Sequence, residues 1–124
     1  MHKKKILVID DEEAFTEVVK FNLEETGKYE VRVENKGARG FDAAKEFRPD
    51  LILLDIIMPG MGGDKVAFQL KNSEDTKNIP VILLTAIVTK EEEAGAGGVL
   101  SGYHVIAKPV DLEKLIAAVE ELCP

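Results

Sequence analysis

Short apolar runs alternate with amphipathic stretches along the chain. The segments Lys5–Ile9 and Leu51–Leu54 are continuously apolar after the first lysine, which is typical of parallel strands that helices cover on both faces. Three further segments have strand character: Tyr29–Val33, Pro80–Leu84 and Tyr103–Ala107. Because such segments alternate with helical ones, the pattern predicts an α/β fold with five strands.

Five stretches between and after these strands have helical spacing. The clearest is the last, because an apolar stripe runs from Leu112 to Leu122 and Asp111 precedes it as a candidate N-cap. The other four helices are predicted at Glu13–Thr26, Gly37–Phe47, Asp64–Lys71 and Thr89–Leu100. The fourth of these contains several glycines, each costing a helix interior about 1 kcal/mol relative to alanine. We therefore expect that helix to be short.

Composition narrows the possible classes of function. A chain of 124 residues with 45% hydrophobic and 31% charged residues predicts one globular domain over residues 1–124. The net charge of -7 argues against direct binding to nucleic acid or to anionic lipid. No apolar run approaches the roughly 18 residues of a membrane span, and Cys123, the only cysteine, excludes an intramolecular disulfide. We expect a cytoplasmic protein without membrane or direct nucleic-acid contact.

Polar residues follow four of the predicted strands. The carboxyl ends of parallel strands share one edge of the sheet, where ligands bind. The residues at these ends are Asp10, Asp11 and Glu12 after the first strand, then Asp55, Thr85 and Lys108. Carboxylates gathered at one edge repel each other unless a cation offsets them, and oxygen ligands suit Mg2+ with several retained waters. The pattern predicts a site for a hard metal ion.

Four segments resemble, in order, the motifs of the receiver domains of two-component response regulators. These segments are Ile6–Glu12, Leu51–Gly60, Leu83–Ala86 and Ala107–Pro109, and the resemblance extends over essentially the whole chain. It implies a flavodoxin-like, doubly wound parallel sheet in the order 2-1-3-4-5 with five helices. It also implies a signalling protein rather than an enzyme, with self-catalysed phosphotransfer and autodephosphorylation as its only chemistry.

The resemblance assigns a role to each of the three aspartates. Asp55 would accept a phosphoryl group from a sensor histidine kinase or a phosphotransfer protein. Asp10, Asp11, Asp55 and the backbone carbonyl of Ile57 would bind Mg2+. The residue chemistry agrees, since a carboxylate is a competent nucleophile at phosphorus when a metal neutralises the phosphoryl oxygens. Phosphorylation would then change a protein-binding surface whose downstream target is unknown.

The same resemblance assigns roles to Thr85 and Lys108. At one position near Lys108 the chain departs from the family pattern. The hydroxyl of Thr85 would meet a phosphoryl oxygen, and Lys108 would pair with the phosphoryl anion, roles that suit their donor groups. The family usually carries an aromatic residue three positions before this lysine, whereas this chain has Val105, with Tyr103 two residues earlier. We expect the switch to work without the usual rotation of an aromatic ring.

Three other functions place different requirements on these residues. A phosphorylation-independent interaction module would keep the acidic pocket without depending on it for partner binding. A Mg2+-dependent phosphohydrolase of the haloacid-dehalogenase type needs a second acid two residues after its nucleophile, where this chain has Ile57. A flavin or dinucleotide site needs a glycine-rich or hydroxyl-rich phosphate loop after the first strand. The acidic residues from Asp10 to Glu13 would instead repel anionic phosphates, so the interaction module is the main alternative.

Overall fold

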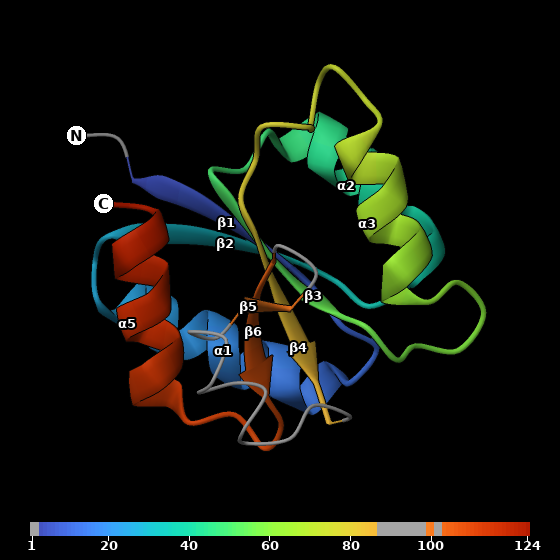
Figure 1. Ribbon diagram of the computed structural model, residues 1–124. Coiled ribbons are helices and arrows are strands. Elements are labelled where there is room, and N and C mark those ends of the chain that lie inside the picture. Colours follow the sequence, from blue (N-terminus) through green and yellow to red (C-terminus); the bar gives the residue numbers. More distant parts are fainter. Residues whose placement is uncertain (1–2, 87–98, 101–102) are drawn as a thin grey trace.

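The computed structural model describes residues 3–86, 99–100 and 103–124, which form a twisted sheet with helices on both faces (Figure 1). The strands are β1 (Lys4–Ile9), β2 (Tyr29–Glu34), β3 (Leu51–Asp55), β4 (Val81–Thr85), β5 (Val99–Leu100) and β6 (Tyr103–Ala107). They lie in the order β2-β1-β3-β4-β6-β5. The five longer strands are all parallel. Since β6 is the fifth predicted strand, Tyr103–Ala107, the arrangement confirms the predicted order 2-1-3-4-5.

The described residues contain four α-helices rather than the predicted five. They are α1 (Glu13–Glu25), α2 (Gly40–Phe47), α3 (Gly63–Lys71) and α5 (Leu112–Leu122), and a short 3-10 turn over Gly37–Arg39 precedes α2. The side chain of Asp111 accepts hydrogen bonds from the backbone N–H groups of Glu113 and Lys114. Asp111 is therefore the N-cap of α5, as its position before the apolar stripe predicted.

The predicted helix Thr89–Leu100 is wrong at its last two residues. Val99 and Leu100 form the strand β5, which pairs antiparallel with His104 and Tyr103 of β6. The backbone groups of Val99 and Leu100 pair with β6 in the sheet. This pairing with a neighbouring strand outweighs the local helical pattern. Residues 89–98 of the predicted helix lie outside the described part of the chain.

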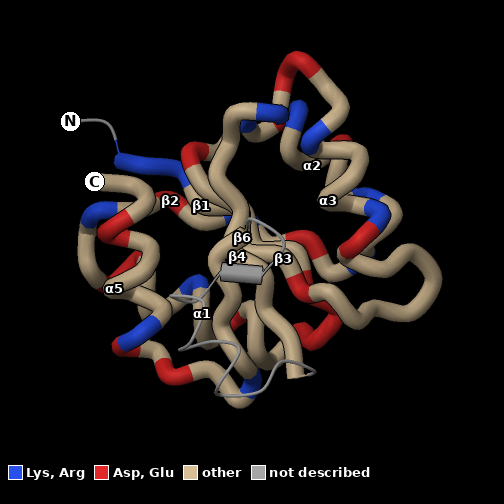
Figure 2. The backbone as a smooth tube through the Cα atoms, in the orientation of Figure 1, with Lys and Arg blue, Asp and Glu red and all other residues tan. Residues whose placement is uncertain are grey.

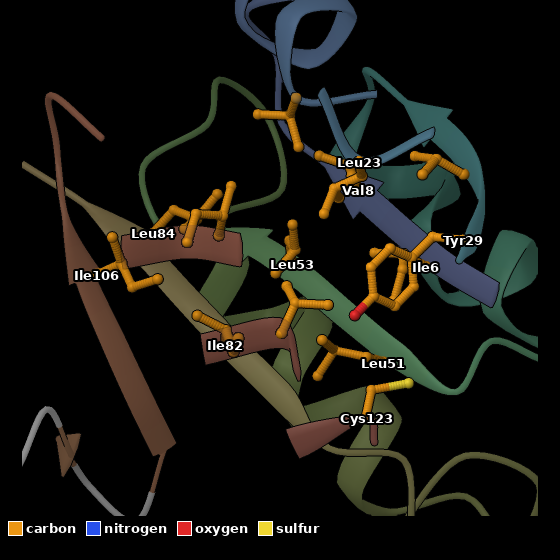
Figure 3. Packing of buried hydrophobic residues seen from close by; sticks show 14 residues of the cluster. Ile6, Val8, Leu23, Tyr29, Leu51, Leu53, Ile82, Leu84, Ile106 and Cys123 are labelled. Carbon is orange, nitrogen blue, oxygen red and sulfur yellow. The ribbon is translucent and has the colours of Figure 1, made fainter. Parts of the chain in front are cut away.

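Two apolar clusters cover the two faces of the sheet and explain why its central strands are continuously apolar. Successive side chains of a strand point to opposite faces. Ile6, Val8 and Leu53 therefore pack with α1 and α5 (Figure 3), whereas Leu7, Ile9 and Leu54 pack with α2 and α3. Burial on both faces keeps the sheet rigid and fixes where the carboxyl ends of β1 and β3 lie.

Over the described ranges, none of the helices combines the length and the apolar character that a membrane crossing requires.

Candidate functional site

Three aspartates come together at the carboxyl edge of the sheet. Asp10 follows β1 directly, and Asp55 is the last residue of β3. Asp10 is fully buried and Asp55 is 3% exposed. Asp10, Asp11 and Asp55 each offer one carboxylate oxygen, and these three oxygens lie within 4.8 Å of one another. The structure thus brings together the three carboxylates that the strand ends predicted.

Lys108 provides a positive charge next to these carboxylates. Its ammonium nitrogen lies 2.8 Å from Asp10 Oδ2 and 3.6 Å from Asp55 Oδ2, and its side chain is 15% exposed. The same nitrogen donates a hydrogen bond of 2.7 Å to Oε1 of Glu12. The pairing with Glu12 was not predicted, although Glu12 belongs to the acidic run that the sequence places at this edge. The ammonium group of Lys108 thus lies closer to Asp10 and Glu12, which follow β1, than to Asp55.

Short local hydrogen bonds hold the acidic side chains in place. The backbone N–H of Glu12 donates to Oδ1 of Asp10 at 2.9 Å, and the N–H of Ile57 donates to Oδ1 of Asp55 at 3.3 Å. Both bonds span two residues, as in an Asx-turn. In both aspartates the other carboxylate oxygen, Oδ2, faces Lys108. The distance to the ammonium nitrogen is 2.8 Å from Asp10 and 3.6 Å from Asp55.

Gly63, the first residue of α3, supports the loop that carries Asp55. Its backbone N–H donates to the carbonyl oxygen of Ile56 at 2.8 Å. A Cβ atom at position 63 would lie 2.7 Å from the Cα of Ile56 and would overlap the backbone carbonyl of Asp55. Only glycine allows this approach, so the start of α3 and the end of β3 are in direct backbone contact.

The electrostatics of the site follow from burial and from its excess of negative charge. Burial, followed by the charge of Asp10, raises the pKa of Asp55 to about 6, although Lys108 and the Ile57 N–H act in the opposite direction. Burial by itself would lower the pKa of Lys108, but its bonds to Asp10 and Glu12 raise the pKa above the ordinary value for lysine. At neutral pH the site therefore holds a mainly ionised Asp55 carboxylate beside the positively charged ammonium group of Lys108.

The donor set of the site fits a magnesium ion. Mg2+ binds oxygen ligands at about 2.0–2.1 Å, so two ligand atoms of one ion are at most about 4.2 Å apart. The three aspartate oxygens, which lie within 4.8 Å of one another, need only small side-chain adjustments to reach this spacing. Lys108 neutralises part of the negative charge, but one ammonium group does not offset three carboxylates. A divalent cation would reduce this excess.

Thr85 and Ile57, the other residues predicted for the site, lie at the same edge. Thr85 is fully buried at the end of β4, and its carbonyl oxygen accepts a 3.0 Å hydrogen bond from the N–H of Lys108. Ile57 lies two residues after Asp55 with a side chain that is 58% exposed. The peptide bond between Lys108 and Pro109 is cis.

The residues before Lys108 differ from the aromatic arrangement that the family usually has. Val105 is 4% exposed and packs in the apolar cluster formed with α2 and α3. Tyr103 is partly buried against the same cluster, and its ring centre lies 5.1 Å from the ammonium nitrogen of Lys71 on α3. The aromatic ring of β6 is therefore engaged with α3, two residues away from the expected position.

Figure 2 shows how charge is distributed around the site. Charged residues are spread over the helices, the loops, the start of β1 and the edge strand β2, whereas β4 is uncharged throughout and β3 is uncharged until Asp55. The charged groups of the site thus begin where the apolar strands end.

Comparison with known proteins places this geometry in a family. The sequence profile of the response regulator receiver domain matches residues 6–120. The chain is 37% identical over 119 residues to the DNA-binding dual master transcriptional regulator RpaA of Synechocystis, covering 95% of this chain and 48% of RpaA. It is 33% identical over 118 residues to the polar-differentiation response regulator DivK of Brucella anthropi, covering 94% of each chain. The chain thus spans about half the length of RpaA and most of DivK.

Solved structures agree with the sequence relatives. The chemotaxis protein CheY4 of Vibrio cholerae superposes with a TM-score of 0.82 at 25% identity, covering 98% of this chain and 99% of that one. The structural match confirms the flavodoxin-like receiver fold that the sequence predicted.

Proposed function

Since the chain belongs to the family of response regulator receiver domains, we propose that it is a phosphorylation-dependent switch in two-component signalling. Asp55 accepts a phosphoryl group from a sensor histidine kinase or a phosphotransfer protein, and the modified domain presents a changed surface to a protein target. The observation that carries the proposal is the buried Asp55 carboxylate within an acidic cluster, 3.6 Å from the ammonium group of Lys108. We place this activity in the cytoplasm.

The proposed reaction is a transfer between nitrogen and oxygen. A carboxylate oxygen of Asp55 attacks phosphorus, a new P–O bond forms, and the P–N bond to the donor histidine breaks. The electron pair of that bond returns to the imidazole as the leaving group, and Asp55 becomes an acyl phosphate. With a pKa of about 6, Asp55 is mainly ionised at neutral pH and needs no separate base before it attacks.

The other residues of the site bind and orient the reacting groups. Asp10, Asp11, Asp55 and the backbone carbonyl of Ile57 would hold Mg2+, which supplies positive charge to the phosphoryl oxygens. Lys108 moves from its closer contacts with Asp10 and Glu12 to pair with the phosphoryl anion, and the Thr85 hydroxyl donates to a phosphoryl oxygen. Apart from this transfer and the hydrolysis of its own acyl phosphate, the domain catalyses no reaction on other substrates.

Phosphorylation by a small donor tests the proposal. The full chain is incubated with acetyl phosphate with Mg2+ and, separately, with a chelator, and its intact mass is followed over time. We expect a mass gain of one phosphoryl group that requires Mg2+ and that Asp55→Asn abolishes. The matched control is Asp75→Asn, which removes an exposed carboxylate outside the site and should leave the modification unchanged.

Two outcomes would contradict the proposal. Sustained consumption of acetyl phosphate without modification of Asp55 would indicate a phosphohydrolase. Absence of any reaction under these conditions would instead favour the alternative of a phosphorylation-independent interaction module with a receiver fold.

A further inference from the structure

Asn35 connects the acidic loop after β1, residues Asp10–Glu12, to two other elements. No motif of the sequence had indicated this role. Asn35 is the first residue after β2, so it lies at the same carboxyl edge of the sheet as Asp10 and Asp55. Its Nδ2 atom donates to the backbone carbonyl oxygen of Asp10 at 2.8 Å and to Oγ1 of Thr16 on α1 at 3.1 Å. A single amide group thus links β2, the acidic loop and α1.

The hydrogen-bond partners establish the direction of both bonds. A carbonyl oxygen can only accept, so the amide nitrogen of Asn35 must face Asp10. Thr16 is fully buried, and its hydroxyl already donates to the carbonyl oxygen of Glu13 at 2.9 Å. Its oxygen therefore accepts from the second N–H of Asn35. Each of the two amide hydrogens has one acceptor, which fixes the orientation of the Asn35 side chain.

Glu34 and Asn35, at the end of β2, form hydrogen bonds with both backbone polar groups of Asp10. Its N–H donates to the carbonyl oxygen of Glu34 at 3.1 Å, and its own carbonyl accepts from Asn35. The Asp10 carboxylate is then oriented by the Glu12 N–H, which donates to Oδ1 at 2.9 Å. Among these three bonds only the one from Asn35 has a side-chain donor, so it can be removed by mutation without changing Asp10 itself.

We propose that Asn35 is a positioning residue that sets the Mg2+ affinity of the site by fixing the main chain of Asp10. This inference rests on the proposed function, because it concerns the ion that phosphotransfer to Asp55 requires. Mg2+ demands nearly ideal octahedral geometry, so a small displacement of Asp10 weakens binding. Groups that orient metal ligands typically change metal affinity 10–100-fold when they are removed.

Calorimetric titration of the unphosphorylated full chain with MgCl2 tests this role without using activity. We expect Asn35→Ala to raise the dissociation constant for Mg2+ about tenfold. Asn35→Asp should also raise it, even though the extra negative charge alone would attract the cation, because an ionised carboxylate cannot donate to the Asp10 carbonyl. The matched control is Asn22→Ala, which removes a 2.8 Å bond from Asn22 Nδ2 to the Val18 carbonyl on α1.

A kinetic measurement separates positioning from a loss of folded protein. In Asn35→Ala, the Mg2+ concentration that gives half-maximal phosphorylation by acetyl phosphate should rise in parallel with the dissociation constant. The rate at saturating Mg2+ should stay within about twofold of wild type, because the nucleophile and Lys108 are intact. Thermal melting in chelator checks that the variants are folded.

The outcomes distinguish this inference from the proposed function. Unchanged Mg2+ affinity in both Asn35 variants would overturn the positioning role, while a wild type that is phosphorylated on Asp55 would leave the proposed function intact. Equal loss of affinity in Asn22→Ala would also overturn it, because the effect would then be general destabilisation of α1. If the wild type binds no Mg2+, both the inference and the proposed function fall.

Discussion

β3 contains two kinds of buried residue, and the contrast between them separates the stability of this domain from its chemistry. Leu53 is fully buried in the cluster formed with α1 and α5, and two residues later Asp55 is 3% exposed. Burial of the leucine removes apolar surface from water and stabilises the fold. Burial of the aspartate disfavours its charged form, as its raised pKa indicates. Within one strand, burial of Leu53 thus stabilises the folded protein, and burial of Asp55 destabilises it when the carboxylate is ionised.

The largest expected effect lies on the apolar side of this comparison. Leu53→Ala should lower the free energy of unfolding by about 3–4 kcal/mol, because it removes buried methyl groups and leaves a cavity between the sheet and α1. Urea unfolding followed by circular dichroism measures the change. A loss below about 1 kcal/mol would contradict the view that this cluster is tightly packed.

The next effect concerns the cation that offsets the carboxylates. Lys108→Met should lower the free energy of unfolding in chelator by about 2–3 kcal/mol, because the fully buried Asp10 loses the ammonium group 2.8 Å away. The same unfolding assay applies. Combining this change with Asp10→Asn should recover part of the loss; a double variant whose loss equals the sum of the two single losses would show that the charges are not coupled.

Removal of the buried Asp55 carboxylate should change the free energy of unfolding in the opposite direction. Burial raises the pKa of Asp55 in the folded protein to about 6, above the value of 3.8 that an aspartate ordinarily has. Ionisation therefore costs stability as pH rises from about 4 to above 6. In chelator at pH 7, Asp55→Asn should raise the free energy of unfolding by about 2 kcal/mol, and near pH 3 the difference should vanish.

Two comparisons sharpen this prediction. Asp75→Asn, at an exposed position, should change stability by no more than about 0.5 kcal/mol. Added Mg2+ should stabilise the wild type more than Asp55→Asn, because the variant loses one ligand. A wild type that is as stable as Asp55→Asn across the pH range would mean that burial of Asp55 carries no cost.

The smallest effect is expected where charges are exposed. Arg32 and Glu46 form an ion pair of 3.1 Å, and the Glu46 side chain is 66% exposed. Water and salt screen such pairs, so Glu46→Gln should change the free energy of unfolding by less than about 0.5 kcal/mol. Measured beside Lys108→Met, it shows whether burial, rather than the ion pair itself, decides the energetic effect.

The sequence predicted the parts of the fold that depend on local pattern. The uninterrupted apolar residues of β1 and β3 indicated burial on both faces, and the order of the five parallel strands was confirmed. Val99 and Leu100 were placed in a helix because their pairing with β6 is a tertiary contact, which local propensity does not contain.

The site was predicted to a similar extent. Residues at the carboxyl ends of β1, β3, β4 and β6 were recognised because the ends of parallel strands meet at one edge, and the three aspartates do come together there. Asn35 was missed even though it follows β2 at that same edge. A charged or hydroxyl group at a strand end indicates metal or phosphoryl chemistry by its type alone, whereas the contribution of an amide depends on which carbonyl it reaches. The pairing of Glu12 with Lys108 likewise depends on side-chain distance.

The backbone contact between Gly63 and the end of β3 limits how this protein can vary. Every other amino acid carries a Cβ atom, which at position 63 would meet the Cα of Ile56 and the carbonyl of Asp55. In a library that randomises this codon, loss of phosphorylation should therefore accompany all substitutions alike, whatever their polarity or charge. An engineer who alters the first turn of α3, for example to graft a new recognition helix, should begin the replacement after this glycine.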